Sequence, residues 1–238
     1  MTEGDGKPAQ HLEALLAAAS DQRRPAPADA VAFWSGKLPP LLLDIWRRYG
    51  MVRLAEGPVR LVEPRRFEPL MAYIFNGYPD LDGDTHTIAL GGLGELILWS
   101  QRHGFGFLRP SLAALEVPYI LSHGAPPADT QIADLVIPIR PPEIEAFDPE
   151  QQPVYDRLRA RLGQLDNDDI YAATPAPPQL GGTPVEDYEV ADALEWLEAV
   201  YSEMNIMLVD FDRDPIELRM VGQPWPAGMG AGTKRVPL

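Results

Sequence analysis

The chain has 238 residues, of which 45% are hydrophobic, and its 35 acidic and 20 basic residues give a net charge of −15. This composition is typical of a folded protein and excludes a disordered, charge-dominated chain. The absence of cysteine excludes disulfides, thiolate metal sites and cysteine nucleophiles, and it fits a reducing cytoplasm.

Helical patterns dominate the first fifty residues. Residues 9–19 place leucine and alanine at helical spacing, and a short helix capped by Asp29 and reaching Trp34 follows a proline-rich break. The segment LPPLLLDIWRRYG, residues 38–50, has proline just inside its start and Gly50 just beyond its end. That arrangement predicts a complete amphipathic helix.

Strand patterns occupy the middle of the chain. Residues 51–64 alternate about a turn and predict a β-hairpin whose arginines, Arg53 and Arg60, face water. A helix over about 65–75 follows, and then three short strands, THTIALGG, GELILW and GFGFLR. One more candidate strand, 135–139, ends at a double proline.

The second half begins with a predicted helix over about 149–162, capped by Asp148 and stopped by Gly163. A long loop rich in proline and glycine is expected over 165–184. A closing helix over about 185–205 follows, because its apolar residues recur at helical spacing.

Charge divides the chain unevenly. Residues 141–238 hold 19 acids against 7 bases, whereas residues 1–140 hold 16 against 13. This shift favours two domains. The predicted elements indicate an α+β protein, with a mixed α/β N-terminal domain containing a small sheet and a smaller, mostly helical, acidic C-terminal domain. The expected parts are the first domain with its N-terminal helix, a connecting segment with a strand, the acidic domain and a loose tail, at residues 1–115, 116–144, 145–212 and 213–238.

The acids are densest between Glu186 and Glu198, where six occur without a basic residue. On the predicted helix, the side opposite the apolar stripe holds four of these acids, Glu189, Asp192, Glu195 and Glu198. An ordered acidic surface repels phosphates and attracts basic proteins. A surface that is merely solvated stays an open alternative.

Two groups of aspartates could hold a metal. Asp80, Asp82 and Asp84 resemble the start of an EF-hand loop, but the sixth and twelfth positions hold Thr85 and Gly91 rather than glycine and glutamate. A solvated loop is therefore favoured.

The second group is Asp166, Asp168 and Asp169, for which capping of a turn is favoured over metal binding. The four histidines match no zinc or triad spacing, and the glycine pairs at 91–92 and 181–182 lack the context of a nucleotide-binding turn. No nucleophile, base and oxyanion donor assemble, so we expect no enzyme, cofactor or metal.

One stretch resembles a known domain family, the GAD-like domain. The family pattern runs from an LP-x-L-L-x-x-W-x-x-x-G helix through a hairpin to V-x-P-x-x-F/Y-x-P-L, and a later G-x-L-x-x-W closes it. The residues that carry it are Leu38, Pro39, Leu41, Leu42, Trp46, Gly50, Val62, Pro64, Phe67, Pro69, Leu70, Gly94, Leu96 and Trp99. The departure is Leu93, where the family usually has phenylalanine.

Residues 161–200 resemble the C-terminal domain that follows GAD-like domains in immunity proteins of type VI secretion DNase effectors. Asp169 replaces a glutamate, and Ala172, Ala173 and Pro177 depart from the pattern. The matching residues are Leu162, Gly163, Leu165, Asp168, Ile170, Tyr171, Pro175, Ala176, Leu180, Gly181 and Gly182.

This pair of resemblances implies an antitoxin that binds and neutralises a cognate basic nuclease toxin in the cytoplasm, by covering its DNA-binding or active site, with no nucleic-acid or membrane partner. Direct covering is the favoured mode, and binding elsewhere with distortion of that site is also compatible. The rival interpretations are a metal-dependent enzyme using the aspartate groups and an interaction module unrelated to toxins. We predict partner binding by nine acids, Asp166, Asp168, Asp169, Glu186, Asp187, Glu189, Asp192, Glu195 and Glu198.

Overall fold

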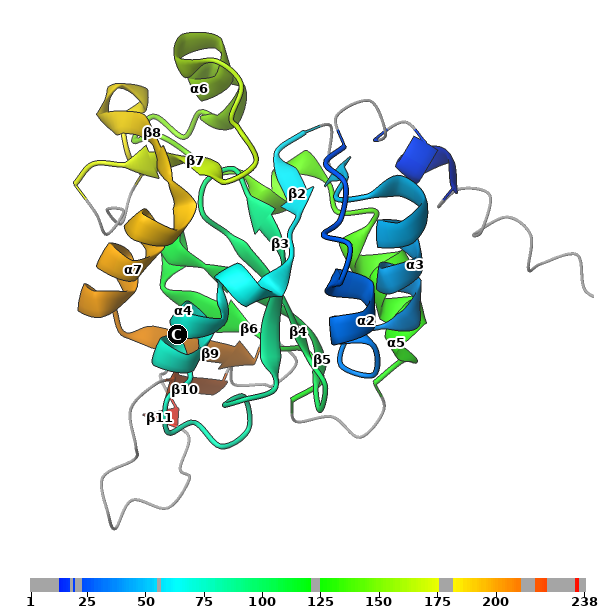
Figure 1. Ribbon diagram of the computed structural model, residues 1–238. Helices are drawn as coiled ribbons and strands as arrows, with labels where there is room; N and C mark the ends of the chain where they lie inside the picture. Colours follow the sequence, from blue (N-terminus) through cyan, green and yellow to red (C-terminus); the bar gives the residue numbers. More distant parts are fainter. Residues whose placement is uncertain are drawn as a thin grey trace, which may run out of the picture.

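The computed structural model describes residues 13–17, 19, 23–54, 57–120, 125–175, 182–210, 217–221 and 234–235. Within these residues the fold is α+β, with a nine-stranded mixed sheet at its centre and a small two-stranded sheet beside it (Figure 1). The strand order of the large sheet is β1-β2-β3-β4-β5-β6-β9-β10-β11. Neighbouring strands are antiparallel except β6 and β9, which are parallel.

The hairpin and the three glycine-separated strands expected from the sequence are confirmed, as β1 with β2 and as β3, β4 and β5. Each of these segments is rich in β-branched, aromatic or leucine side chains bounded by a turn. The strands of the large sheet are β1 (Arg53–Leu54), β2 (Val59–Leu61), β3 (Thr85–Gly91), β4 (Leu96–Ser100), β5 (Gly104–Arg109), β6 (Ala114–Glu116), β9 (Ile206–Asp210), β10 (Glu217–Val221) and β11 (Lys234–Arg235).

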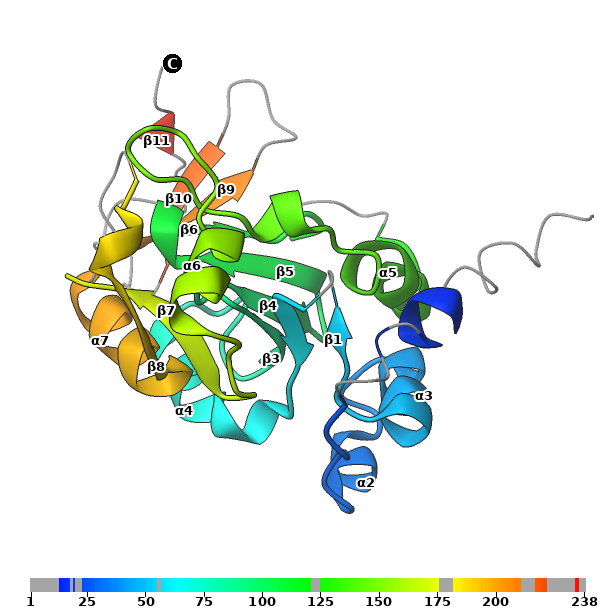
Figure 2. The same cartoon turned by 90° about the horizontal axis from the view of Figure 1, so that it is seen from above.

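The large sheet has a core on each face. Along β4, Leu96 and Leu98 enter one core while Ile97 and Trp99 enter the other, because successive side chains of a strand point to opposite faces. Figure 2 shows α2, α3 and α5 on one side of the sheet and α4 and α7 on the other. The helices are α2 (Ala30–Trp34), α3 (Pro40–Tyr49), α4 (Glu68–Ile74), α5 (Ala128–Gln131), α6 (Tyr155–Leu162) and α7 (Ala193–Glu203).

Helix α3 confirms the clearest helical pattern. It begins at Pro40 and ends before Gly50, whose φ of 77° lies in the left-handed region. A Cβ at Gly50 would lie 2.5 Å from the carbonyl oxygen of Arg24, so a side chain is also sterically excluded. The expected cap of α2 was wrong. Asp29 makes no capping bond, and its carboxylate instead accepts from Arg65 Nη1 at 2.6 Å.

The expected strand at 135–139 was wrong. Helix α5 continues into a π-helical turn, Ile132–Val136, in which Ile132 and Val136 are buried against the α2–α3 side of the sheet. A short apolar run fits a buried helix as well as a strand, and tertiary packing decides between them.

Helix α6 begins later than predicted. Asp148 caps no helix; its carboxylate accepts from the backbone N–H groups of Glu150 and Gln152 and pairs with Arg157. The side chain thus stabilises a turn that delays the helix to Tyr155. The predicted end is confirmed, at Gly163 with φ of 87°.

The regions expected as a loop over 165–184 and a long closing helix over 185–205 both contain a strand. β7 (Asp169–Ala173) pairs with β8 (Tyr188–Asp192), and α7 begins only at Ala193. Asp192 caps this helix, accepting from Leu194 N at 2.9 Å and Glu195 N at 3.2 Å. The description of the C-terminal part as mostly helical was therefore wrong, since strands account for much of it.

Two separate domains are not confirmed. β9 lies within the expected acidic domain at 145–212, yet it pairs with β6, which belongs to the first 116 residues. One hydrophobic core contains residues from Val62 to Val221. A continuous sheet and a shared core therefore join the two parts.

The terminal expectations are tested only in part. Residues 13–17 are helical, as predicted, while 9–12 lie outside the described residues. The expected tail contains a strand, β10, which pairs with β9. Its last segment, GMGAGTKRVPL, lies outside the described residues apart from 234–235. No helix in the described residues is long and apolar enough to span a bilayer.

Candidate functional site

The two hairpin arginines lie at the junction between the N-terminal and C-terminal parts of the chain. The prediction that they face water was wrong. Arg60 is only 2% exposed and donates from Nη1 to the carbonyl oxygen of Asp166 at 2.5 Å. Arg53 donates from Nη2 to the carbonyl oxygen of Leu165 at 2.9 Å. Strand alternation gives the face of a side chain but not what covers that face, so no sequence signal marked this contact.

Burial lowers the pKa of Arg60 to about 10, and the neighbouring Arg53 adds to this shift. The guanidinium is still charged at neutral pH. A buried cation must have acceptors, and the carbonyls of the 165–166 segment supply them. The C-terminal part is thereby fixed to the hairpin by charge-assisted hydrogen bonds.

Arg66 makes a second junction with two of the predicted partner-binding acids. Its Nη1 lies 2.8 Å from Asp168 Oδ1, and its Nη2 bonds to Asp192. Arg24 also lies 3.6 Å from Asp168. Burial raises the pKa of Asp192, but the hydrogen bond and charge of Arg66, together with the backbone N–H groups of Glu195 and Leu194, outweigh burial and lower that pKa. Asp168 and Asp192 are therefore engaged within the molecule.

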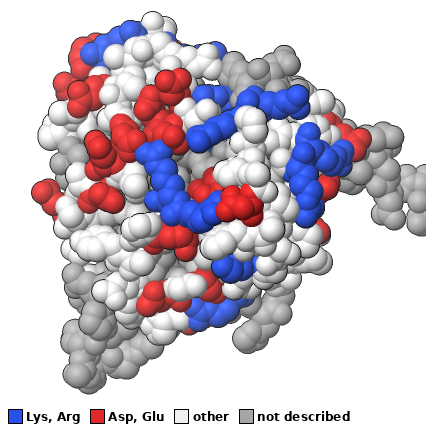
Figure 3. Space-filling view, viewed as in Figure 1, with Lys and Arg blue, Asp and Glu red and all other residues white. Residues whose placement is uncertain are grey.

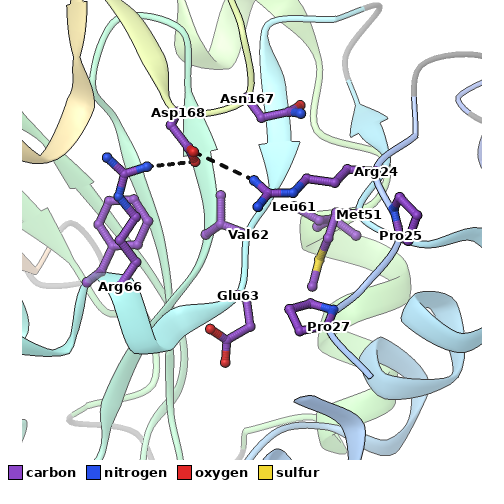
Figure 4. A pocket seen from close by; sticks show the side chains of 11 residues that line it. Arg24, Pro25, Pro27, Met51, Leu61, Val62, Glu63, Arg66, Asn167 and Asp168 are labelled. Carbon is purple, nitrogen blue, oxygen red and sulfur yellow. Dashed lines mark ion pairs between the residues drawn. The ribbon is translucent and has the colours of Figure 1, made fainter. Parts of the chain in front are cut away.

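A small pocket opens beside this junction, with a volume of about 140 Å³ (Figure 4). Arg24 and Arg66 approach Asp168 from opposite sides, and Met51 and Val62 form part of the apolar wall. Both arginines are already paired with carboxylates. A pocket this small, below the ~300 Å³ of ordinary ligand sites, has room for little more than a side chain.

The remaining predicted acids are distributed differently from the paired ones. Five of them, which we call the acidic face, are exposed on the 3₁₀ turn before β8, on β8 and on α7. None of the five forms an ion pair with another described residue. Figure 3 shows acidic side chains gathered over this region. The acidic face consists of Glu186, Asp187, Glu189, Glu195 and Glu198.

The last two predicted acids, Asp166 and Asp169, lie beside this region. Asp166 is exposed, and its backbone carbonyl holds Arg60; Asp169 is partly exposed at the start of β7. The sequence predicted one long helix for the acids of 186–198 and a loop for Asp166, Asp168 and Asp169. The structure instead distributes the acids of 186–198 over a 3₁₀ turn, β8 and the shorter helix α7, and places Asp169 on β7.

The candidate metal groups do not converge. Asp84 is buried, and its Oδ2 accepts from Arg102 Nε at 2.7 Å and from Ser100 Oγ at 3.2 Å. Asp168 is bound by arginines. Among the residues that the structure describes, no three His, Asp or Glu side chains are arranged to hold a metal ion.

A buried carboxylate, Glu95, was missed in the sequence. It is 4% exposed, in the turn between β3 and β4, and its Oε2 accepts from Leu93 N at 3.2 Å. Burial raises its pKa to about 7. A glutamate directly after GGLG gave no signal of depth, because the turn itself looked like a surface feature.

The glycines of that turn allow close packing. A Cβ at Gly92 would lie 2.4 Å from the ring of Tyr155, and one at Gly94 would lie 2.7 Å from Trp196. Tyr171 N also donates to the Gly92 carbonyl at 2.8 Å. The small glycines therefore let the backbone of this turn approach its neighbours closely.

Comparison with known proteins gives a partial identification. Residues 10–108 match the family model of the GAD-like domain, as the N-terminal pattern indicated. No curated protein matches the chain. The crystal structure of Atu4351 from Agrobacterium tumefaciens is similar, with a TM-score of 0.78 and 20% identity, covering 86% of this chain and 94% of that chain. At this identity the likeness shows the fold alone, and the resemblance of residues 161–200 to an immunity-protein domain stays a prediction.

Proposed function

We propose that the protein is an immunity protein that binds and neutralises a cognate type VI secretion DNase in the cytoplasm. Two lines support the proposal. The GAD-like domain at residues 10–108 is present, and the segment that follows resembles the C-terminal domain of such immunity proteins. The interaction is stoichiometric binding, with no catalytic residue, metal or cofactor of its own.

The observation that carries the proposal is the acidic face. Its five carboxylates are exposed, lie on ordered elements and have no basic partner among the described residues. A DNase must be basic where DNA phosphates dock, because those contacts supply most of its affinity for DNA. A rigid acidic surface can occupy that basic site and exclude DNA, and complementary charge accelerates the encounter.

The internal ion pairs reduce the set of acids that are free to contact a partner. Asp168 and Asp192 are held by Arg66, so contact with a partner would require breaking those pairs. Glu189, Glu195 and Glu198 have no such cost. We therefore assign the partner contact to the acidic face and give Asp168 and Asp192 an internal structural role.

The test is inhibition of the nuclease encoded beside this gene. Purified protein at equal molar ratio should block DNA cleavage, and the triple variant E189K, E195K and E198K should weaken inhibition at least tenfold. A matched control changes three exposed acids elsewhere, D82K, D134K and E150K, with the same change in net charge. Equal inhibition by both triple variants would show that the acidic face has no specific role.

Two further outcomes bear on the function itself. If no basic nuclease is encoded next to this gene and none is inhibited, the immunity role is wrong and an interaction module of another kind is favoured. Inhibition by the wild-type protein should also weaken as the salt concentration rises, because the attraction between exposed charges is screened over ~8 Å at physiological ionic strength.

A further inference from the structure

Among the described residues, no strand pairs with the outer edge of β8. β8 pairs with β7 on one side, with Tyr171 opposite Val190 and Ala172 opposite Glu189. In an antiparallel pair, residues alternate between those that exchange hydrogen bonds with the partner strand and those whose N–H and C=O point away. The pattern is therefore fixed once the direction of one residue is known.

Three contacts fix that direction. Ala193 N donates to Asp168 O at 2.9 Å, which makes the odd-numbered residues of this stretch the ones that bond to β7. Tyr171 N donates away from β8, to Gly92. Tyr188 O accepts from Arg161 Nη1 at 3.1 Å, on the outer edge. Val190 therefore directs its N–H and C=O outward, and no described residue bonds to them.

The exposed part of this edge lacks the usual protections. Natural edge strands are blunted by lysine, proline or a bulge. β8 has the sequence YEVAD and pairs with β7 in continuous register, without a bulge. Arg161 closes the edge at Tyr188, but Val190 in the centre is 43% exposed. An exposed β-branched residue with free backbone groups is a surface on which another strand can pair.

Charge selects the kind of strand. Glu189 lies on β8 itself, and Glu186 and Asp187 precede the strand. A second copy of this chain would bring like charges together, which disfavours self-pairing. A segment with lysine or arginine would instead meet opposite charge at each of these positions.

We propose that the outer edge of β8 binds an extended basic segment of the nuclease as a third strand of the β7–β8 sheet. This inference rests on the proposed immunity function and specifies how part of the acidic face is engaged. Side chains directly opposite on paired strands share a face. The bound segment therefore carries an apolar side chain opposite Val190, with a basic residue beside it that lies near Glu189.

Val190→Pro separates this pairing from the rest of the surface. Proline removes the outward N–H, while the bonds of β8 to β7 use Glu189 and Ala191 and are kept. Val190→Ala is the matched control, because it loses the side chain but keeps the N–H. Affinity for the nuclease should be at least tenfold weaker for V190P than for V190A, since at least one backbone hydrogen bond is lost and its carbonyl partner is left unpaired.

Hydrogen exchange in the wild-type protein gives a second readout that does not depend on the fold of a variant. The Val190 amide should exchange much more slowly in the complex with the nuclease than in the free protein. Equal binding by V190P and V190A, or unchanged exchange of that amide in a formed complex, would overturn the strand pairing and leave the immunity function standing. The absence of any complex with the wild-type protein would overturn the function, and the pairing with it.

Discussion

The junction around Arg60 and the acidic face both involve the C-terminal part of the chain, but their charged groups have different surroundings. At the junction the arginines of the hairpin and of the segment before α4 are buried or paired, and they bind carbonyls and carboxylates of residues 165–192. On the acidic face the carboxylates point to water without a cation. Bases from the N-terminal part thus hold the C-terminal part in place, and the acids left over form the free surface.

Net charge alone therefore does not identify a binding surface. The excess of acids in residues 141–238 is evident from the sequence, but Asp168 and Asp192 belong to the same excess and serve the fold. The two regions should therefore respond oppositely to substitution. Changes at the junction should alter stability, whereas changes on the acidic face should alter binding.

The largest effect is expected at the junction, for Arg60→Met. The substitution keeps much of the apolar stem but removes two hydrogen bonds from a charged donor, to the carbonyls of Asp166 and Gly91, and only the Gly91 carbonyl keeps another donor, Gly94 N. A hydrogen bond from a charged group contributes about 1.5–3 kcal/mol, so the free energy of unfolding should fall by about 4 kcal/mol. Urea denaturation measures this loss.

Arg48→Met is the matched control. Arg48 pairs with Glu13 and Asp44 at the surface, where ion pairs contribute little, so its loss should change stability far less than the loss of Arg60 does. Equal losses of unfolding free energy in the two variants would contradict this prediction, because burial would then confer no special role on Arg60.

A smaller effect is expected for Glu95→Gln, and it should depend on pH. The pKa of Glu95 is about 7 in the folded protein, against an ordinary 4.5, so the folded state holds this proton more tightly than the unfolded state. The resulting stabilisation is complete below pH 4.5 and is lost as pH rises to 7. Wild-type protein should therefore lose about 3 kcal/mol relative to E95Q between these pH values.

Unfolding free energies of both proteins at pH 5, 6, 7 and 8 test this prediction, and E198Q on the acidic face is the control that should show no comparable trend. If wild type and E95Q depend on pH in parallel, Glu95 does not titrate near neutrality. In that case the Glu95 carboxylate would behave like an exposed acid and not like a buried one.

Local signals in the sequence were sufficient for several elements. Helix α3 has proline at its start, glycine beyond its end and one apolar face, so composition and spacing agree. The hairpin and strands β3 to β5 are separated by clear turn residues. The acidic character of the C-terminal part was also readable, because charge needs no knowledge of contacts.

Other features depend on contacts distant in sequence. The depth of Arg60 is set by residues more than a hundred positions away, which no local pattern contains. β7 and β8 were hidden because 165–184 is rich in proline and glycine, and because the acids and apolar residues of 185–205 also fit a helix. The spacing that suggested one acidic helix is broken where Asp192 ends a strand and caps α7.

The smallest effect on stability is expected on the acidic face itself. Replacing Glu189, Glu195 and Glu198 together by glutamine should change the free energy of unfolding by less than about 1 kcal/mol, because exposed charges without an ion-pair partner contribute little. Asp192→Ala is the contrast, since it removes both a helix cap and the pair with Arg66 and should cost about 1–2 kcal/mol. Thermal and urea unfolding of the two variants at neutral pH compare them directly. A triple variant that is destabilised as much as D192A would mean that these glutamates serve the fold, and that their exposure is not evidence of a partner.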